Sequence, residues 1–248
     1  MASTATYDVT VLSDSEVSRV LVVAAHPDDI DFSAAGTVAA FTEAGIEVTY
    51  LIVTPGDAGG FDPAVPRTEI PGIRQAEQTA AAKQVGVSDL RFLGYPDGRV
   101  EANLELRRDI ARVIRQVRPD RMLVPNPERN YQRMAPSHPD HRAVGAASLD
   151  AVYPDARNPF AHPELADEGL EAWAVRETWL VGGPQPNHYP DVTATFARKL
   201  AALRSHTSQI VNIPDLEAML RGWMSRTAEA AGLPEGSLAE AFQVIDST

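Results

Sequence analysis

The sequence predicts an α/β fold: a Rossmann-like, doubly wound, mostly parallel sheet with helices on both faces. Between residues 19 and 153, short apolar runs typical of buried strands alternate with helical segments. Strands separated by helices favour a parallel sheet, and right-handed crossovers then favour the doubly wound arrangement. The chain has 248 residues, a length that fits one large domain. We therefore expect a single domain over 1–248, with a Rossmann-like core at 19–153 and a C-terminal extension at 154–248 that completes it.

The core strands are expected at 19–25, 47–54, 90–93 and 121–124. The first of them, R-V-L-V-V-A-A, is the continuous apolar run of a strand that is buried on both faces. The core helices are expected at 33–44, 74–85, 104–117 and 139–152. Gly45 suits the C-terminal cap of the first helix, and Pro119 stops the third. The Gly- and Pro-rich stretch 56–72 is expected to form a loop.

Beyond Tyr153 the pattern is looser. Further strands are expected at 172–181 and 189–193, and further helices at 195–204 and 215–231.

Composition excludes several classes of protein. The chain has no cysteine, so disulfides and thiolate metal sites are impossible and any metal must be bound by His, Asp or Glu. A net charge of −12 argues against binding to nucleic acid or to an anionic membrane. No apolar run approaches the ~20 residues that span a bilayer, and the polar segment 1–18 lacks the pattern of a secretory signal. We expect a cytoplasmic protein with no membrane span and no nucleic-acid partner.

The sharpest motif, His26-Pro27-Asp28-Asp29, directly follows the first predicted strand. Open α/β sheets place their ligand sites at the carboxyl ends of strands. A turn there can aim His26 and Asp29 at one point, and an imidazole with a carboxylate is a good donor pair for zinc. Asp28 would lie beside the metal. Taken alone, the tetrapeptide is also compatible with a polar turn that caps the next helix.

A second cluster, Ser137-His138-Pro139-Asp140-His141, follows the fourth predicted strand. Pro139 suits the first turn of a helix, which places His138 near the N-cap, and His141 can face the same side as His138. In a sheet of order 3-2-1-4-5, strands 1 and 4 are neighbours, so the two clusters should lie close together. Two ligands from the first loop and one from the second would leave a coordination position open, as a hydrolytic metal site needs.

These motifs resemble those of the LmbE/PIG-L family of zinc-dependent N-acetylglucosamine deacetylases. The resemblance covers 19–153 well and extends to 189–209. It rests on Ala25-His26-Pro27-Asp28-Asp29, Gly36-Thr37, His138-Pro139-Asp140-His141, Asp191-Val192-Thr193 and His206-Thr207-Ser208-Gln209. The chain departs from the family pattern at Asp31, where Glu is frequent, and at Ser33-Ala34-Ala35, which replaces a stretch with Gly and Cys. Neither change touches an expected ligand.

The resemblance implies roles in a metal centre. His26, Asp29 and His141 match the metal ligands, and Asp28 matches the general base. Zinc is the expected ion, and availability can replace it with Fe²⁺ or another divalent metal.

The resemblance also implies roles around that centre. His138 matches the histidine that stabilises the oxyanion or protonates the leaving amine. Arg74 matches a substrate-contacting arginine, although an arginine on an alanine-rich helix is also compatible with a solvated or salt-bridged side chain. Asp97 matches an acidic position near the sugar pocket. Asp140 is a candidate carboxylate partner that orients one of the histidines.

We therefore expect a zinc-dependent N-deacetylase, an amidohydrolase acting on linear amides, whose substrate is an N-acetyl-amino sugar or a related N-acylated small molecule. An amidase for a larger amide conjugate, and a non-catalytic metal- or sugar-binding protein on the same fold, are the alternatives left open. A dinucleotide-binding enzyme is disfavoured because no Gly-x-Gly-x-x-Gly turn follows the first strand, and a phosphatase using Asp29-Ile30-Asp31 would leave the second cluster unexplained.

His206 is either structural or part of the site. The Pro-rich last stretch is expected to cover the site or to pack against another subunit of a homo-oligomer.

Overall fold

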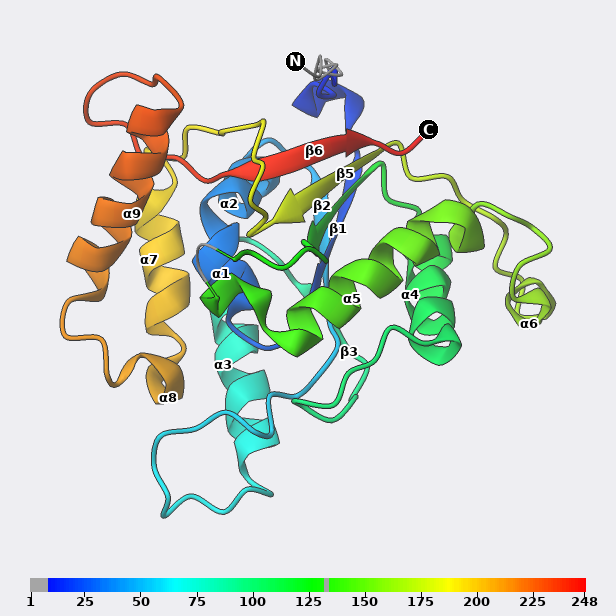
Figure 1. Ribbon diagram of the computed structural model, residues 1–248, viewed down its shortest axis with the longest axis horizontal. Coiled ribbons are helices and arrows are strands. Elements are labelled where there is room, and N and C mark those ends of the chain that lie inside the picture. The colour runs from blue at the N-terminus through cyan, green and yellow to red at the C-terminus, as the bar shows by residue number, and fades with distance from the viewer. Residues whose placement is uncertain (1–8, 132–133) are drawn as a thin grey trace.

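A single six-stranded sheet organises the molecule (Figure 1). The computed structural model describes residues 9–131 and 134–248. The strands are β1 (Arg19–Ala24), β2 (Glu47–Ile52), β3 (Asp89–Phe92), β4 (Arg121–Pro125), β5 (Glu177–Val181) and β6 (Phe242–Asp246). The α-helices are α1 (Asp29–Ser33), α2 (Ala35–Glu43), α3 (Ile70–Gln84), α4 (Leu104–Val117), α5 (Pro139–Asp150), α6 (Pro163–Asp167), α7 (Phe196–Arg204), α8 (Thr207–Ile210) and α9 (Leu216–Ala230).

The strand order is β3-β2-β1-β4-β5-β6, which confirms the predicted α/β class and the predicted 3-2-1-4-5 order. β1 to β5 pair in parallel, and β6 closes the sheet by pairing antiparallel with β5. The order reverses between β1 and β4, so the loops that follow these two strands meet at the switch point. None of the helices in the described part of the chain is long and apolar enough to cross a membrane.

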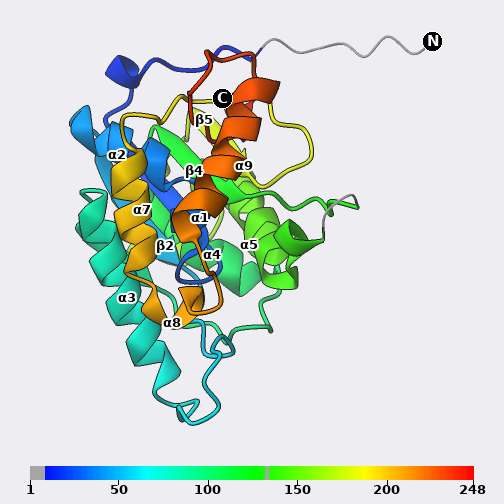
Figure 2. The same cartoon turned by 90° about the vertical axis from the view of Figure 1, so that its left-hand side faces the viewer.

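Helices cover both faces of the sheet, and each face has its own apolar core (Figure 2). Alternate β1 side chains serve the two cores: Val20 and Val22 pack with α2 and α3, whereas Leu21 and Val23 pack with α4 and α5. This arrangement explains why β1 is apolar at every position after Arg19. A third apolar cluster joins α7 to α9.

The helix expected at 33–44 is present as α2, and a short helix that was not predicted, α1, precedes it; the two meet at Ala34 with non-helical backbone. The break is stabilised by a buried ion pair from distant sequence. Lys199 Nζ donates to the carbonyls of Asp31 and Phe32 at 3.0 and 2.8 Å, and to Glu240 at 2.7 Å. Glu240 also accepts the N–H groups at the start of α2. Side chains therefore pair with four backbone groups next to the break, those of Asp31, Phe32, Gly36 and Thr37.

Two expectations for the C-terminal region are corrected. The strand expected at 172–181 begins only at Glu177. The strand expected at 189–193 is wrong, because this segment makes only isolated bridges at His188 and Asp191. The true sixth strand, β6, was not predicted, although its buried Phe242 and Val244 alternate with less buried neighbours.

Close packing of α5 on the end of β4 fixes where the second histidine cluster lies. A Cβ atom at Gly145 would stand 2.2 Å from the carbonyl oxygen of Pro125, so only glycine allows this approach. The N-terminus of α5, which carries His138 and His141, is held beside β4 as a result.

We expect Gly145→Ala to lower the free energy of unfolding by about 1–3 kcal/mol, because the added methyl must displace α5 or the Pro125 carbonyl. Chemical denaturation of the two proteins measures the change. Gly72→Ala is the matched control: Gly72 is exposed in α3 with open space around its Cα, so this variant should be neutral or slightly more stable. Equal stability of Gly145→Ala and wild type would refute the packing argument.

Candidate functional site

The turn after β1 holds Asp28 in a rare backbone conformation. Asp28 has φ 92° and ψ −26°, a left-handed geometry that costs a non-glycine residue about 1–3 kcal/mol. Its N–H donates to Gln78 Oε1 at 2.8 Å, and its carbonyl accepts from the backbone of Asp31 and Phe32. The surrounding contacts thus hold this strained turn, which places His26 and Asp29 on either side of Asp28.

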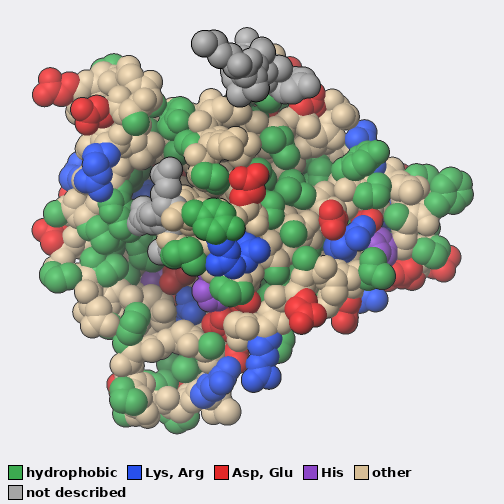
Figure 3. All heavy atoms as spheres, in the orientation of Figure 1, with side chains coloured by type: hydrophobic (Ala, Val, Ile, Leu, Met, Phe, Trp, Pro, Cys, Tyr) green, Lys and Arg blue, Asp and Glu red, His purple; other side chains and the backbone are tan. Residues whose placement is uncertain are grey.

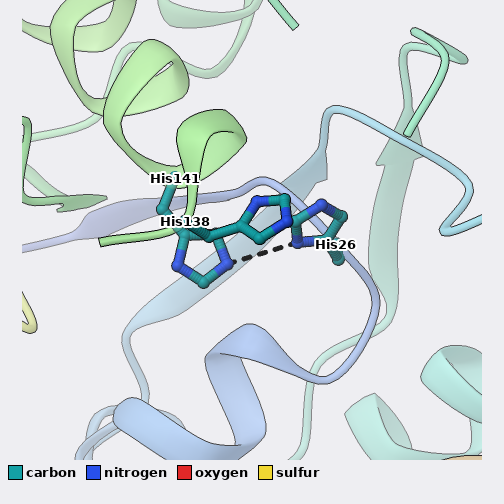
Figure 4. Close-up of side chains that lie close together, drawn as sticks. All are labelled: His26, His138 and His141. Atoms are coloured by element: carbon teal, nitrogen blue, oxygen red, sulfur yellow. Dashed lines mark hydrogen bonds between the residues drawn. The ribbon is translucent and has the colours of Figure 1, made fainter. Parts of the chain in front are cut away.

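The second cluster enters the site from the N-terminus of α5. His138 is the N-cap residue, and its Nδ1 accepts the N–H of Asp140 at 3.2 Å. A neutral His138 therefore carries its proton on Nε2. The rings of His26, His138 and His141 face one another, with centroids 4.9 to 5.3 Å apart (Figure 4). The two clusters, more than 100 residues apart in sequence, lie together as the topology predicted.

His26, Asp29 and His141 converge on one point. His26 Nδ1 lies 3.2 Å from His141 Nε2. One carboxylate oxygen of Asp29 lies 3.0 Å from His141 Nε2, and the other lies 3.4 Å from His26 Nδ1. Two imidazole nitrogens and a carboxylate within a few ångströms form a donor set suited to a divalent ion.

The opposite edge of His26 is anchored on two buried carboxylates. His26 Nε2 lies 3.1 Å from Asp97 Oδ1 and 3.2 Å from Asp140 Oδ2. Because a carboxylate only accepts hydrogen bonds, Nε2 carries a proton, and Nδ1 is the ring nitrogen that faces Asp29 and His141 and would bind a metal ion in place of its own proton. Asp140 thus orients a histidine, the role expected of it. Asp97 makes the same contact, and its expected place in a sugar pocket stays a prediction.

The carboxylates around His26 favour a positive charge at this point of the site. Burial alone would lower the pKa of His26, but hydrogen bonds to Asp140, Asp29 and Asp97 raise it to about 12. Burial would raise the pKa of Asp29, yet the His141 charge and hydrogen bonds from His141 and His26 hold it far below its usual range. A divalent cation placed among these groups would supply the same positive charge, so the residues fit a metal ion.

Asp28 and Arg74 form a buried pair beside this cluster. An Arg74 guanidinium nitrogen donates to Asp28 Oδ2 at 3.1 Å and to the Pro27 carbonyl, and another donates to the Gly56 carbonyl at 3.3 Å. Arg74 is only 4% exposed and pairs with Asp28, so it is not a solvated arginine, and its expected contact with substrate stays a prediction. Burial, followed by the negative charge of Asp29, raises the pKa of Asp28 to about 7.

A buried polar chain behind Asp28 was missed by sequence reasoning. Gln78 accepts from Asp28 N–H and donates to Asp31 Oδ2 at 2.8 Å, and His206 Nε2 lies 2.8 Å from the same oxygen. Asp31 and His206 are fully buried. The signal available in the sequence was the spacing of Arg74, Glu77 and Gln78, whose i, i+3, i+4 pattern puts a polar stripe on the inner face of α3.

Two cavities flank the site. One, of about 510 Å³, is bounded by Asp29 and His141 and otherwise mainly by apolar side chains. The other, of about 450 Å³, is bounded by Arg74 and by polar residues of the α8 region, among them Ser208 and Gln209.

Comparison with known proteins identifies the family. Residues 21–152 match the model of the family described as PIG-L, GlcNAc-PI de-N-acetylase. The chain is 32% identical over 195 residues to diacetylchitobiose deacetylase of Thermococcus kodakarensis, covering 79% of this chain and 71% of the relative. It is 34% identical over 198 residues to a probable N-acetyl-alpha-D-glucosaminyl L-malate deacetylase 2 of Bacillus cereus, covering 77% and 83%.

Among solved structures, the N,N'-diacetylchitobiose deacetylase of Pyrococcus horikoshii with its inhibitor MPG aligns with a TM-score of 0.85 and 28% identity, covering 94% of this chain and 85% of that one. The chain therefore belongs to the PIG-L family, as its motifs predicted.

We expect Gln78→Leu to lower the free energy of unfolding by about 1–3 kcal/mol. The substitution removes the acceptor of the Asp28 N–H and the Gln78 donor to Asp31 Oδ2. Thermal or chemical denaturation measures the loss. Gln75→Leu, on the same helix but with no side-chain hydrogen bond among the described contacts, should change stability by less than ~0.5 kcal/mol. Indistinguishable stabilities for the two variants would show that the buried chain does not support the turn.

Proposed function

We propose that this protein is a zinc-dependent N-deacetylase that removes the acetyl group from an N-acetyl-amino sugar or a related N-acylated small molecule. The observation that carries the proposal is the convergence of His26 Nδ1, His141 Nε2 and the Asp29 carboxylate, with Asp28 and His138 beside them. The named activities of the relatives, deacetylation of diacetylchitobiose and of an N-acetylglucosaminyl malate, support the substrate class.

Two clusters of candidate ligand atoms share His26: one includes His138 and His141, and the other Asp97 and Asp140. We assign the metal to the Nδ1 side, where Asp29 and His141 lie. On the other side, the oxygens of Asp140 are occupied by the N–H groups of Gly98 and Val100 and by His26 itself. The residues of that cluster are buried and its carboxylates are hydrogen-bonded to His26, so we assign it to fixing the orientation of His26.

A donor set of two imidazoles and one carboxylate suits zinc and leaves a coordination position open, with Fe²⁺ as the alternative ion. When bound, the ion would supply the positive charge that acidifies a water molecule and polarises the amide carbonyl.

The side chains around the ion would move the protons. Asp28 is placed to take a proton from the attacking water, as a general base. Arg74 and the Gln78 contact hold Asp28 in position. His138 presents an Nε2–H that can donate to the oxyanion that develops on the carbonyl oxygen. The C–N bond then breaks, the amine gains the proton, and acetate leaves.

Acetate release from a panel of N-acetyl sugars tests the proposal. We expect activity that a chelator abolishes and that zinc restores. Absence of acetate release from every substrate after addition of zinc, or full activity in a protein shown to be free of metal, would overturn it.

Asp28→Asn should keep the bound metal but lower kcat by a factor of ~10² or more, because the amide cannot accept the proton. Metal content and kcat are measured on the same preparation. Asp167→Asn, exposed on α6, is the control and should match wild type. Full activity of Asp28→Asn would remove Asp28 as the base.

Asp140→Asn should weaken zinc binding by about 10- to 100-fold, because His26 loses part of the anchor that fixes its ring and tautomer. Competition with a chromophoric chelator measures the affinity, and circular dichroism checks that the variant is folded. Asp150→Asn, exposed on the same helix, provides the matched control. Unchanged zinc affinity in a folded Asp140→Asn protein would contradict the orienting role.

A further inference from the structure

The apolar cavity beside Asp29 and His141 is larger than an acetyl group requires. It holds about 510 Å³, within the range of about 300–1,000 Å³ for small-molecule sites. Its walls are large apolar side chains from three places in the chain: Phe32 on α1, Ile213 before α9, and Met219 and Trp223 on α9. An acetyl group at the metal would present one methyl to this space and leave most of it empty.

The cavity is part of the site and not a separate surface hollow. Asp29 and His141, two of the proposed metal ligands, form part of its wall, and the ends of β4 and β5 contribute Pro125 and Val181. Figure 3 shows hydrophobic side chains gathered on the left-hand side of the molecule, with histidine visible nearer its centre. A group that fills this cavity while the amide is at the metal can therefore be part of the same substrate molecule.

The second cavity is polar on the side nearest the site and mainly apolar elsewhere. It adjoins Arg74, which bonds to Asp28, and it includes the hydrogen-bonding side chains of Thr207, Ser208 and Asn212. The rest of its wall includes the apolar residues Phe61, Val65, Ile70, Ile73 and Val211. The polar groups suit the hydroxyls of a sugar ring. An amide has one substituent on its carbonyl carbon and one on its nitrogen, and the two point away from each other. The polar side of the second cavity therefore fits the amino sugar, and the apolar cavity beside Asp29 and His141 fits the acyl side.

We propose that the apolar cavity binds an acyl chain several carbons longer than acetyl, so that the preferred substrate is an N-acylated amino sugar with an aliphatic acyl group. This inference rests on the proposed function and extends its substrate class. In the reaction, water adds to the acyl carbon to form the new C–O bond and the C–N bond breaks. A proton from that water passes to the amine, leaving an aliphatic carboxylate and the free amino sugar.

The direct test is a series of N-acyl glucosamines from acetyl to octanoyl, with kcat/KM measured for each on the zinc-loaded enzyme. We expect kcat/KM to rise roughly four-fold for each of the first added methylenes, the factor that corresponds to about 0.8 kcal/mol for burying one CH₂. The rise should stop once the chain fills the cavity.

Two adjacent substitutions localise the effect. Met219→Trp fills the cavity and should lower the hexanoyl-to-acetyl ratio of kcat/KM by at least ~10-fold. Ala218→Trp places the same side chain on the exposed face of α9 and should leave the ratio unchanged. Ile213→Trp, in the loop before α9, fills the same cavity and replaces Met219→Trp if that variant does not fold.

The outcomes separate this inference from the proposed function. A kcat/KM that is highest for acetyl and falls with chain length overturns the acyl assignment and leaves the deacetylase proposal intact. A rise with chain length in a parallel series of N-acetylglucosaminides with alkyl aglycones, and not in the acyl series, also overturns it by placing the apolar group on the sugar. Failure to hydrolyse any substrate, acetyl included, overturns the proposed function and this inference with it.

Discussion

The imidazole of His26 lies between two sets of carboxylates, and the site is built around that position. On one edge, Asp97 and Asp140 accept a hydrogen bond from Nε2; on the other, Nδ1 faces Asp29 and His141. Asp140 ties this arrangement to the backbone, because it also accepts the N–H groups of Gly98 and Val100. The loop after β3, the turn after β1 and the start of α5 thus share one hydrogen-bonded centre.

Side chains from the C-terminal part of the chain also support this centre. Lys199 and Glu240 stabilise the break between α1 and α2, and His206 contacts Asp31. Through Gln78, the same Asp31 is linked to the backbone of Asp28. The strained turn of Asp28 is therefore supported by groups far away in the sequence, such as His206, which contacts Asp31 from 175 residues away. His26 and Asp29, the proposed metal ligands on either side of Asp28, share that support.

The sequence was sufficient for the strand order of the core and for bringing the two His/Asp clusters together, because the positions of strand ends follow from β/α alternation and the switch-point rule. It was not sufficient where contacts between residues far apart in the sequence, and not the local sequence pattern, determine the structure. The short helix α1 and its junction with α2 at Ala34 were not predicted, and the buried Lys199–Glu240 pair that contacts this junction comes from distant sequence. Asp97 shows the same limit, because only the fold reveals that its oxygens meet His26 and the Ala58 N–H. Deacetylase chemistry came from the resemblance of motifs, whereas the cavities required the three-dimensional structure.

The central claim is that His26 binds a metal through Nδ1 while Nε2 is held by carboxylates. A crystal structure of the zinc-loaded protein, with the ion located by its anomalous scattering, tests this claim most directly. We expect an ion about 2.0–2.2 Å from His26 Nδ1, His141 Nε2 and an Asp29 oxygen. An ion bound instead among His26 Nε2, Asp97 and Asp140 would contradict it.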